Sequence, residues 1–258
     1  DVDFGGNDEF ELDAADPDGE MSFEDVEDAF AGADADGAFD DAFDDDFGGS
    51  DLDTDLDTTV PADTVALIDG DEVVTTSTLE RLREMVLFVN SDIYTTGTRG
   101  LEELVVPDVV LELSDTAFRL WGFPVSDTQK LVLITMSRYV EQLAFERGVG
   151  TLRAAFQRLS RLDSEPGTRR VYERLADTEL EVHAYGIPDS RPPDLTIQTH
   201  HGRNHDYRRM WVVTFCPPDD GRHVALLAHE RVANLWDGFW TFDTETVRAI
   251  NQHMATQL

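Results

Sequence analysis

The sequence predicts an α/β (α+β) protein in which a mixed, mostly antiparallel sheet is flanked by helices and preceded by a disordered acidic tail. Three observations predict this arrangement. The first 60 residues contain 24 acidic residues and no basic one. Beyond them, stretches of alternating apolar residues are interspersed with stretches of helical spacing, which is typical of mixed architectures. No expected strand is followed by a GxGxxG or Walker loop, which argues against a doubly wound nucleotide-binding fold.

Residues 1–60 form the expected tail. Their sequence is of low complexity, as in FDDAFDDDFGGSDLDTDLDT, and a segment with so many like charges and few aliphatic residues cannot bury enough surface to offset its chain entropy. Phe39, Phe43 and Phe47 recur every four residues, a spacing that also permits folding on a partner protein. The tail is therefore interpreted either as solvated filler or as a partner-recognition arm.

An N-terminal α/β subregion is expected over residues 61–125. TVALIDGDEVVTT alternates around an Asp-Gly turn, which predicts a β-hairpin. STLERLREMVLFV has apolar residues at helical spacing and places Ser77 three residues before Glu80, as in a capping box. AFRLWGFP, residues 117–124, predicts a further strand.

Residues 126–258 are expected to form the main folded core. SDTQKLVLITMSRYVEQLAFERG predicts one long helix that ends at Gly148. EPGTRRVYERLADT predicts a helix opened by Pro166, and TFDTETVRAINQHM predicts a closing helix capped by Asp243. Strands are predicted for TLRAAFQRL (151–159), LEVHAYGIP (180–188), LTIQT (195–199), MWVVTFC (210–216) and HVALLAH (223–229).

The whole chain is strongly acidic, and its charge limits the partners that it can bind. It carries 54 acidic residues against 20 basic ones, for a formal net charge of −34, and Lys130 is its only lysine. Molar salt shortens the screening length to about 3 Å and relieves such self-repulsion. The scarcity of lysine and the excess of 35 Asp over 19 Glu therefore predict a halophilic, haloarchaeal source. A general attraction to nucleic acid or to anionic lipid is disfavoured.

The expected location of the chain is cytoplasmic. Cys216 is the single cysteine, so no intrachain disulfide can form, as is usual for proteins inside the cell. The sequence contains no run of about 18 apolar residues and no signal-peptide pattern. We therefore expect neither nucleic acid nor a membrane among its partners.

Three segments of the chain resemble the DICT sensory domain as it occurs in haloarchaeal proteins. They are GTLRAAFQRLSRLD, TRRVYERLADTELEVHAYGIPD and WDGFWTFDTETVRAI, within which FQRLSR, HAYGIPD and GFWTFD carry most of the likeness. The resemblance covers residues 64–258 and leaves the acidic tail outside it. It implies a sensor-like fold and a signal-input role, of the kind found beside diguanylate cyclases and two-component kinases, with no catalytic residues.

The chain departs from the pattern of the kinase-fused members of that family. It shows neither a phosphoacceptor helix nor an ATP-binding region, so kinase or cyclase activity does not carry over to it. The resemblance implies that a separate signalling protein, of the two-component kinase or cyclase type, supplies the output. We expect no cofactor and no metal.

Two groups of residues are candidates for contact with a small-molecule ligand. The aromatic residues around GFWTFD lie just ahead of the last helix; such clusters usually close a core, but they also form walls on which planar ligands stack. Strand parity in EVHAY allows two residues to face the same space, and RAAFQRLSRL adds an unusual concentration of positive charge. The candidate ligand-binding residues are Phe156, Gln157, Arg158, His183, Tyr185, Trp236, Trp240 and Phe242.

The stretch THHGRNHDYRR is the densest group of histidines and arginines in the chain. His200, His201 and His205 lack the helical HExxH spacing and the accompanying carboxylate or Cys of familiar zinc sites. A polar loop is therefore favoured over a metal site. An anion is a further ligand that the loop could hold, more strongly when its histidines are protonated. The candidate anion-binding residues are Arg203, Arg208 and Arg209.

The sequence thus predicts a non-enzymatic sensory and signal-transduction module that binds a ligand or a partner and regulates a separate output. Its pocket is expected between the sheet and the aromatic closing segment. Two other functions stay open. One is a metal-assisted hydrolase that uses the histidine-rich loop 200–205, and the other is a structural protein-interaction adaptor.

Overall fold

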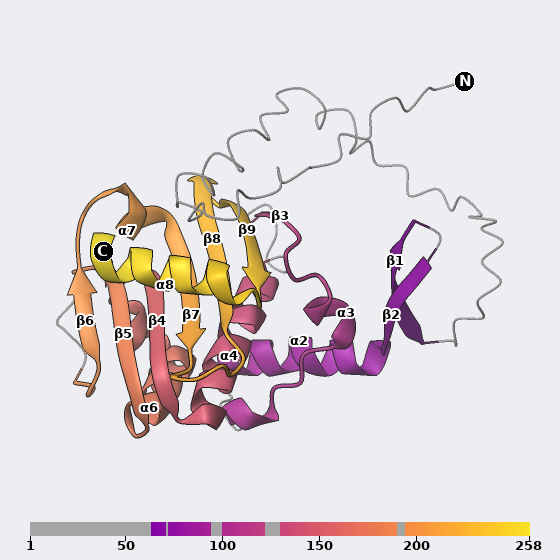
Figure 1. Ribbon diagram of the computed structural model, residues 1–258, viewed down its shortest axis with the longest axis horizontal. Coiled ribbons are helices and arrows are strands. Elements are labelled where there is room, and N and C mark those ends of the chain that lie inside the picture. Colours follow the sequence, from indigo (N-terminus) through magenta and orange to yellow (C-terminus); the bar gives the residue numbers. More distant parts are fainter. Residues whose placement is uncertain (1–62, 71, 94–99, 122–129, 190–193) are drawn as a thin grey trace. The chain divides into compact units, whose positions relative to one another are not determined.

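The structure, a computed structural model, describes residues 63–70, 72–93, 100–121, 130–189 and 194–258 (Figure 1). All the described residues belong to the second of the two units into which the chain divides, residues 50–258. The expected disordered tail and its phenylalanine repeat fall outside the described residues.

A seven-stranded mixed sheet forms the centre of the second unit. In order across the sheet, the strands are β3 (Phe118–Trp121), β9 (Leu235–Thr241), β8 (Val224–Val232), β7 (Met210–Cys216), β4 (Val149–Arg158), β5 (Glu179–Ile187) and β6 (Gln198–His201). The four neighbouring pairs from β3 across to β4 are antiparallel, whereas β4 with β5 and β5 with β6 are parallel. The expected mixed, mostly antiparallel sheet is confirmed.

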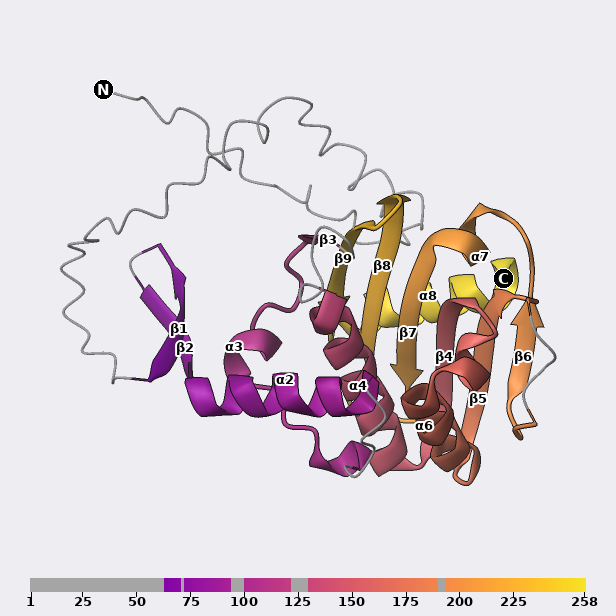
Figure 2. The same cartoon turned by 180° about the vertical axis from the view of Figure 1, so that it is seen from behind.

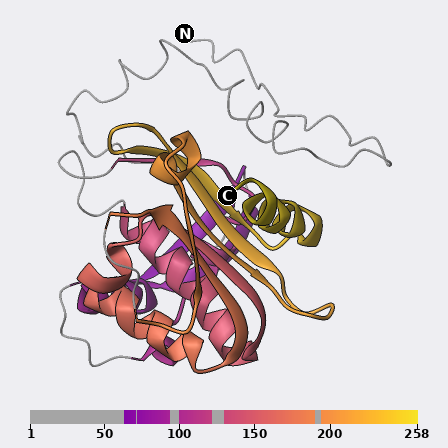
Figure 3. The ribbon, with the colours of Figure 1, turned by 90° about the vertical axis from the view of Figure 1, so that its left-hand side faces the viewer.

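Helices cover both faces of this sheet. α8 (Thr244–Gln257) lies on one face, against β7 and β8, and α4 (Lys130–Arg147) and α6 (Pro166–Ala176) lie on the other (Figures 1 and 2). Seen edge-on, the sheet separates α8 from the remaining long helices (Figure 3). Two short helices, α5 (Arg161–Ser164) and α7 (His205–Arg209), join strands to the elements that follow them.

The alternation of side chains along β7 explains these two layers. Trp211 points to α4, where its indole N–H donates to the Ser137 hydroxyl at 2.8 Å. Thr214, on the opposite side of the strand, contacts the amide of Asn251 in α8. Because both faces of β7 are covered, its residues read as a nearly continuous apolar run instead of an alternating one.

The N-terminal part of the described chain is a hairpin followed by a helix. β1 (Thr64–Asp69) and β2 (Glu72–Thr78) pair antiparallel, and Gly70 takes a φ of 58° in the turn, as the Asp-Gly pair predicted. α2 (Leu79–Ile93) follows directly. The residue that caps it is Thr78, which accepts from the Arg81 amide, because Ser77 is buried and accepts instead from the Val109 amide. A 3-10 turn, Leu101–Glu103, and a short helix, α3 (Asp108–Leu111), lead to β3.

Two apolar clusters fill the space beneath the helices. The first lies between β4, β5, β7 and the pair α4 and α6, with Leu152, Leu162 and Tyr172 fully buried. The second lies between α2, α4 and the β8 and β9 strands, with Met136 and Leu226 at its centre. α4 belongs to both clusters, so it holds the two halves of this helical layer together.

Most of the expected elements are present, with three differences. The aromatic closing segment, for which no strand was predicted, is strand β9. The histidine-rich loop contains helix α7, and the strand expected at 195–199 is displaced to Gln198–His201. Gly238 weakened the strand pattern of β9, and α7 is too short to show a clear helical pattern.

Replacing Leu226 by alanine is expected to lower the free energy of unfolding by about 2–5 kcal/mol, because its side chain is fully buried in the second apolar cluster. Leu87→Ala provides the matched control, since Leu87 is 47% exposed on α2. Chemical denaturation of both variants in molar salt measures the difference. Equal losses in the two variants would contradict the packing described.

Candidate functional site

A cavity of about 320 Å³ lies between the sheet and the helical layer, where α5 joins α6. Its size is near the lower end of the range for small-molecule sites, which begins at about 300 Å³. The described residues that line it come from α4, β4, β7 and the α5–α6 connection. They are Ile134, Ser137, Arg138, Glu141, Phe156, Arg161, Ser164, Glu165, Pro166, Gly167, Thr168, Trp211 and Val213.

The wall on the sheet side of the cavity is apolar and fixed in place. Phe156 meets the ring of Tyr172 edge-on, with 5.2 Å between the centroids. The Trp211 indole N–H is already bonded to Ser137, whose hydroxyl in turn donates to the Leu133 carbonyl at 2.9 Å. This wall therefore offers ring surface to a ligand, and the indole donor is already satisfied.

The wall on the helix side contains a buried ion pair. Arg138 and Glu141, one turn apart on α4, are 5% and 1% exposed and lie 2.6 Å apart between Nη1 and Oε2. Arg138 Nη2 also donates to the Thr168 hydroxyl at 2.9 Å. Burial, together with the nearby Glu141 carboxylate, raises the pKa of Tyr172 well above its usual value, so its hydroxyl stays protonated. Taking an ion pair out of water is costly, so its place at a cavity marks this region as a candidate site.

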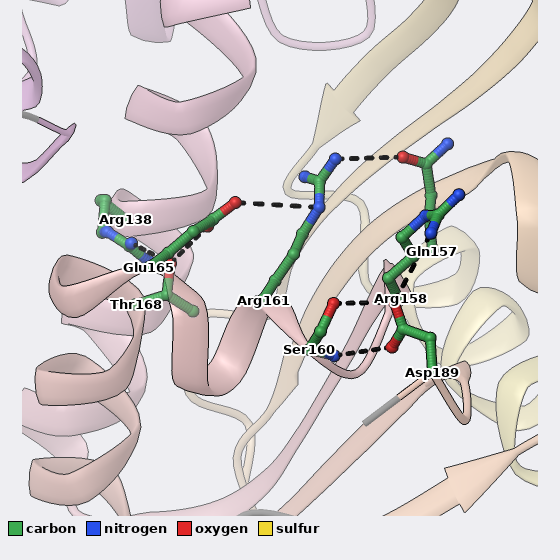
Figure 4. A network of polar contacts seen from close by, with 8 residues as sticks. All are labelled: Arg138, Gln157, Arg158, Ser160, Arg161, Glu165, Thr168 and Asp189. Atoms are coloured by element: carbon green, nitrogen blue, oxygen red, sulfur yellow. Dashed lines mark hydrogen bonds and ion pairs between the residues drawn. The ribbon is translucent and has the colours of Figure 1, made fainter. Parts of the chain in front are cut away.

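The rim of the cavity carries a second, looser pair of charges (Figure 4). Nε of Arg161 lies 3.8 Å from Oε1 of Glu165, and its Nη2 donates to Gln157 Oε1 at 3.3 Å. The guanidinium carbon lies 5.5 Å from the centre of the Trp211 ring. Glu165 Oε2 accepts from Thr168, which connects the rim to the buried pair. The two Arg161 contacts are long for hydrogen bonds, so this guanidinium can turn toward a ligand at little cost.

A bulge in β4 brings this rim into position. The pairing of β4 with β5 shifts between Ala155 and Arg158, and Gln157 takes a φ of 61°, which is unfavourable for a non-glycine residue. The side-chain Nε2 of Gln157 donates to the Arg208 carbonyl at 2.9 Å and to Glu230 Oε2 at 3.2 Å, and these two bonds stabilise the bulge. Bulges re-aim the side chains around them, and this one leaves Phe156 in the cavity wall.

The residues that the sequence singled out for ligand contact do not share one wall. Phe156 lines the cavity, and Gln157 supports Arg161 beside it. Arg158 lies at the surface, 3.6 Å from the carboxylate of Asp189. Trp236 and Trp240 are 2% exposed within the second apolar cluster, and Phe242 packs against both clusters.

His183 and Tyr185 face the opposite side of the sheet, on the face that α8 covers in part. Nδ1 of His183 lies 3.0 Å from Nε2 of His200, and the Tyr185 and His200 rings stack with 4.4 Å between centroids. Arg153 Nη1 donates to the Tyr185 hydroxyl at 2.6 Å. Burial first, and then the Arg153 and His200 charges, lower the pKa of His183 from 6.5 to about 4.

The three histidines of the predicted loop do not converge. His200 packs inward on Tyr185, His201 is exposed, and the ring of His205 lies near that of His229. Among the residues that the structure describes, no group of three or more His, Cys, Asp or Glu could hold a metal ion.

The three arginines of the same loop have separate surroundings. Arg209 Nη1 donates to the Arg231 carbonyl at 2.6 Å. Arg208 Nε donates to the Arg203 carbonyl at 3.1 Å, and Arg203 and Arg208 are exposed. Anion binding by the three together stays a prediction.

One comparison with known proteins points to a sensory function for the part of the chain that contains the cavity. Residues 108–231 match the DICT family, described as a sensory domain in diguanylate cyclases and two-component systems. All the cavity-lining residues lie within that span. The match is consistent with a sensory module of signal transduction.

The other two comparisons add no function. No curated protein matches the chain. The crystal structure of polyphosphate kinase from Porphyromonas gingivalis aligns with 60% of this chain and 27% of its own, at 14% identity and a TM-score of 0.35. Within the described residues, no helix is long and apolar enough to cross a bilayer.

The two ends of the buried pair are expected to be strongly coupled in their effect on stability. Arg138→Met and Glu141→Leu should each lower the free energy of unfolding by about 3–5 kcal/mol, because each leaves a buried charge, whereas the double variant should lose clearly less than the sum. The exposed pair Arg169 and Glu173 on α6, treated in the same way, should show little or no coupling, because solvent screens it. Additive losses at Arg138 and Glu141 would contradict a functioning ion pair.

The lowered pKa of His183 predicts a loss of stability in mild acid. The unfolded chain binds a proton at His183 below pH 6.5, but the folded chain binds it only near pH 4. Acid therefore favours the unfolded chain, and the free energy of unfolding falls as the pH drops from 6.5 to 4. Between about pH 7 and pH 5 the loss is about 2 kcal/mol. His183→Asn should remove this part of the pH dependence, and the exposed His205→Asn should keep it. Unfolding curves with the same pH slope for wild type and His183→Asn would overturn the assignment.

Proposed function

We propose that this chain is a non-enzymatic sensory module in which a small molecule occupies the cavity between α4, α6 and the sheet. The observation that supports it is the buried Arg138–Glu141 pair, which lies at a cavity of metabolite size within the DICT-matched residues. Burial of an ion pair gives little net stability. A role in holding the helical wall of a binding site accounts for its place at the cavity, because Arg138 donates to Thr168, which in turn donates to Glu165 at the rim.

The response follows from how the cavity is built. Its polar side belongs to α4, α5 and α6, and its apolar side belongs to β4 and β7. A ligand that binds Arg161 or Glu165 competes with their contacts to Gln157 and Thr168, and so with the links between the helical layer and the β4 bulge. A ligand that favours one arrangement of these links shifts the population toward it.

The output and the setting are part of the same proposal. Residues 126–258 act as the sensory core, residues 61–125 extend it, and the acidic segment 1–60 acts as tether or partner-recognition arm. A two-component kinase or a cyclase receives the signal. The net charge of −34 and the single lysine support a haloarchaeal cytoplasm at high salt as the working environment.

Filling the cavity should abolish the response to its ligand. Ser164→Trp adds a large side chain at the rim, whereas Glu173→Trp adds the same side chain on the exposed part of α6. A panel of cellular metabolites, screened by thermal unfolding in molar KCl, should contain at least one compound that raises the Tm of the wild type and of Glu173→Trp but not of Ser164→Trp.

Two results of this screen would contradict the proposal. One is that no metabolite raises the Tm of the folded wild type. The other is that the same compound raises the Tm of Ser164→Trp as much as that of the wild type, which would place its site elsewhere.

A further inference from the structure

The charges around the cavity form two pairs that differ in how tightly they are engaged. Arg138 and Glu141 bond each other at 2.6 Å and are almost fully buried. At the rim, the side chains of Arg161 and Glu165 are 24% and 49% exposed, and their closest atoms are 3.8 Å apart. The rim pair is both more exposed and more loosely engaged than the deep pair, so its two charges are the more accessible ones for a ligand that enters the cavity.

The rim pair presents one charge of each sign side by side. A ligand with a single negative charge would gain from Arg161 but face Glu165, and a ligand with a single positive charge would meet the reverse penalty. A ligand with both charges a short distance apart satisfies both groups. Phosphate-rich ligands such as nucleotides are disfavoured, because each arginine of the lining, Arg138 or Arg161, already has a carboxylate beside it, Glu141 or Glu165.

The remainder of the cavity accepts an apolar group. Its sheet side presents Phe156, Trp211 and Val213, and Ile134 adds an aliphatic side chain from α4. The Trp211 indole N–H is bonded to Ser137. A polar substituent placed here would lose its hydration and find no partner on this wall.

We propose that the cavity binds a free α-amino acid with an apolar side chain. This inference rests on the proposed sensory function and names the ligand class of the same site. The carboxylate of the amino acid binds Arg161 and its ammonium group binds Glu165. Its side chain packs against Phe156 and Trp211. The cavity of about 320 Å³ matches a compound of this size.

Matched ligands separate the contributions of the two charges. Calorimetry in molar KCl would compare L-phenylalanine with 3-phenylpropionate, which lacks the ammonium group, and with 2-phenylethylamine, which lacks the carboxylate. L-leucine should bind and L-glutamate should not. Each truncated compound should bind at least about tenfold more weakly than L-phenylalanine, as expected for the loss of one charge-assisted hydrogen bond.

Matched variants assign each charge to a residue. Arg161→Gln should weaken L-phenylalanine to the level of 2-phenylethylamine, and Glu165→Gln should weaken it to the level of 3-phenylpropionate. Arg169→Gln, an arginine of α6 outside the cavity lining, should bind all the compounds like the wild type.

The inference is overturned if a truncated compound binds as tightly as L-phenylalanine, if both rim variants keep the wild-type affinities, or if none of the amino acids binds. The proposed sensory function fails separately, on the metabolite screen with Ser164→Trp. If no amino acid binds and a metabolite of another class binds the wild type but not Ser164→Trp, the proposed ligand class is wrong, whereas the proposed sensory function of the cavity stands.

Discussion

The ion pair between Arg138 and Glu141 decides how α4 and α6 can meet over the sheet. Both charges are removed from water on the buried side of α4, so each needs a partner within the protein. Thr168, in the first turn of α6, supplies one of these partners. α6 must therefore begin close to α4. The space that is left between this junction and the sheet is the cavity.

The elements of the fold could be predicted where the apolar pattern is long. The helix that contains Leu133 and Val140 and the strand that contains Val212 and Val213 belong to stretches whose burial follows directly from their residue types. β9 was missed because Gly238 interrupts it and its aromatic residues resemble a core-closing turn. The order of the strands was beyond the sequence, because it depends on pairings between segments far apart in the chain.

The candidate site was predictable only in part, for a physical reason. Phe156 lines the cavity, and its strand is apolar on the side that faces the helices; its contact with a ligand stays a prediction. The sequence did not indicate that Arg138 and Glu141 are buried at a cavity, because polar residues on a helix normally lie on its solvated face. The tryptophans of the closing segment were natural candidates for ligand contact, yet the sheet places Trp236 and Trp240 in the second apolar cluster. Only tertiary contacts distinguish a buried ion pair from a surface one.

Hydrogen exchange, measured on the full chain with and without a metabolite that raises its Tm, tests most directly whether this cavity is the sensory site. The account predicts slower exchange in residues 134–141 of α4, in residues 161–168 and at residues 211–213 of β7, since these three segments wall the cavity. Protection confined to the histidine and tyrosine cluster of β5 and β6, or to the β1–β2 hairpin, would contradict it.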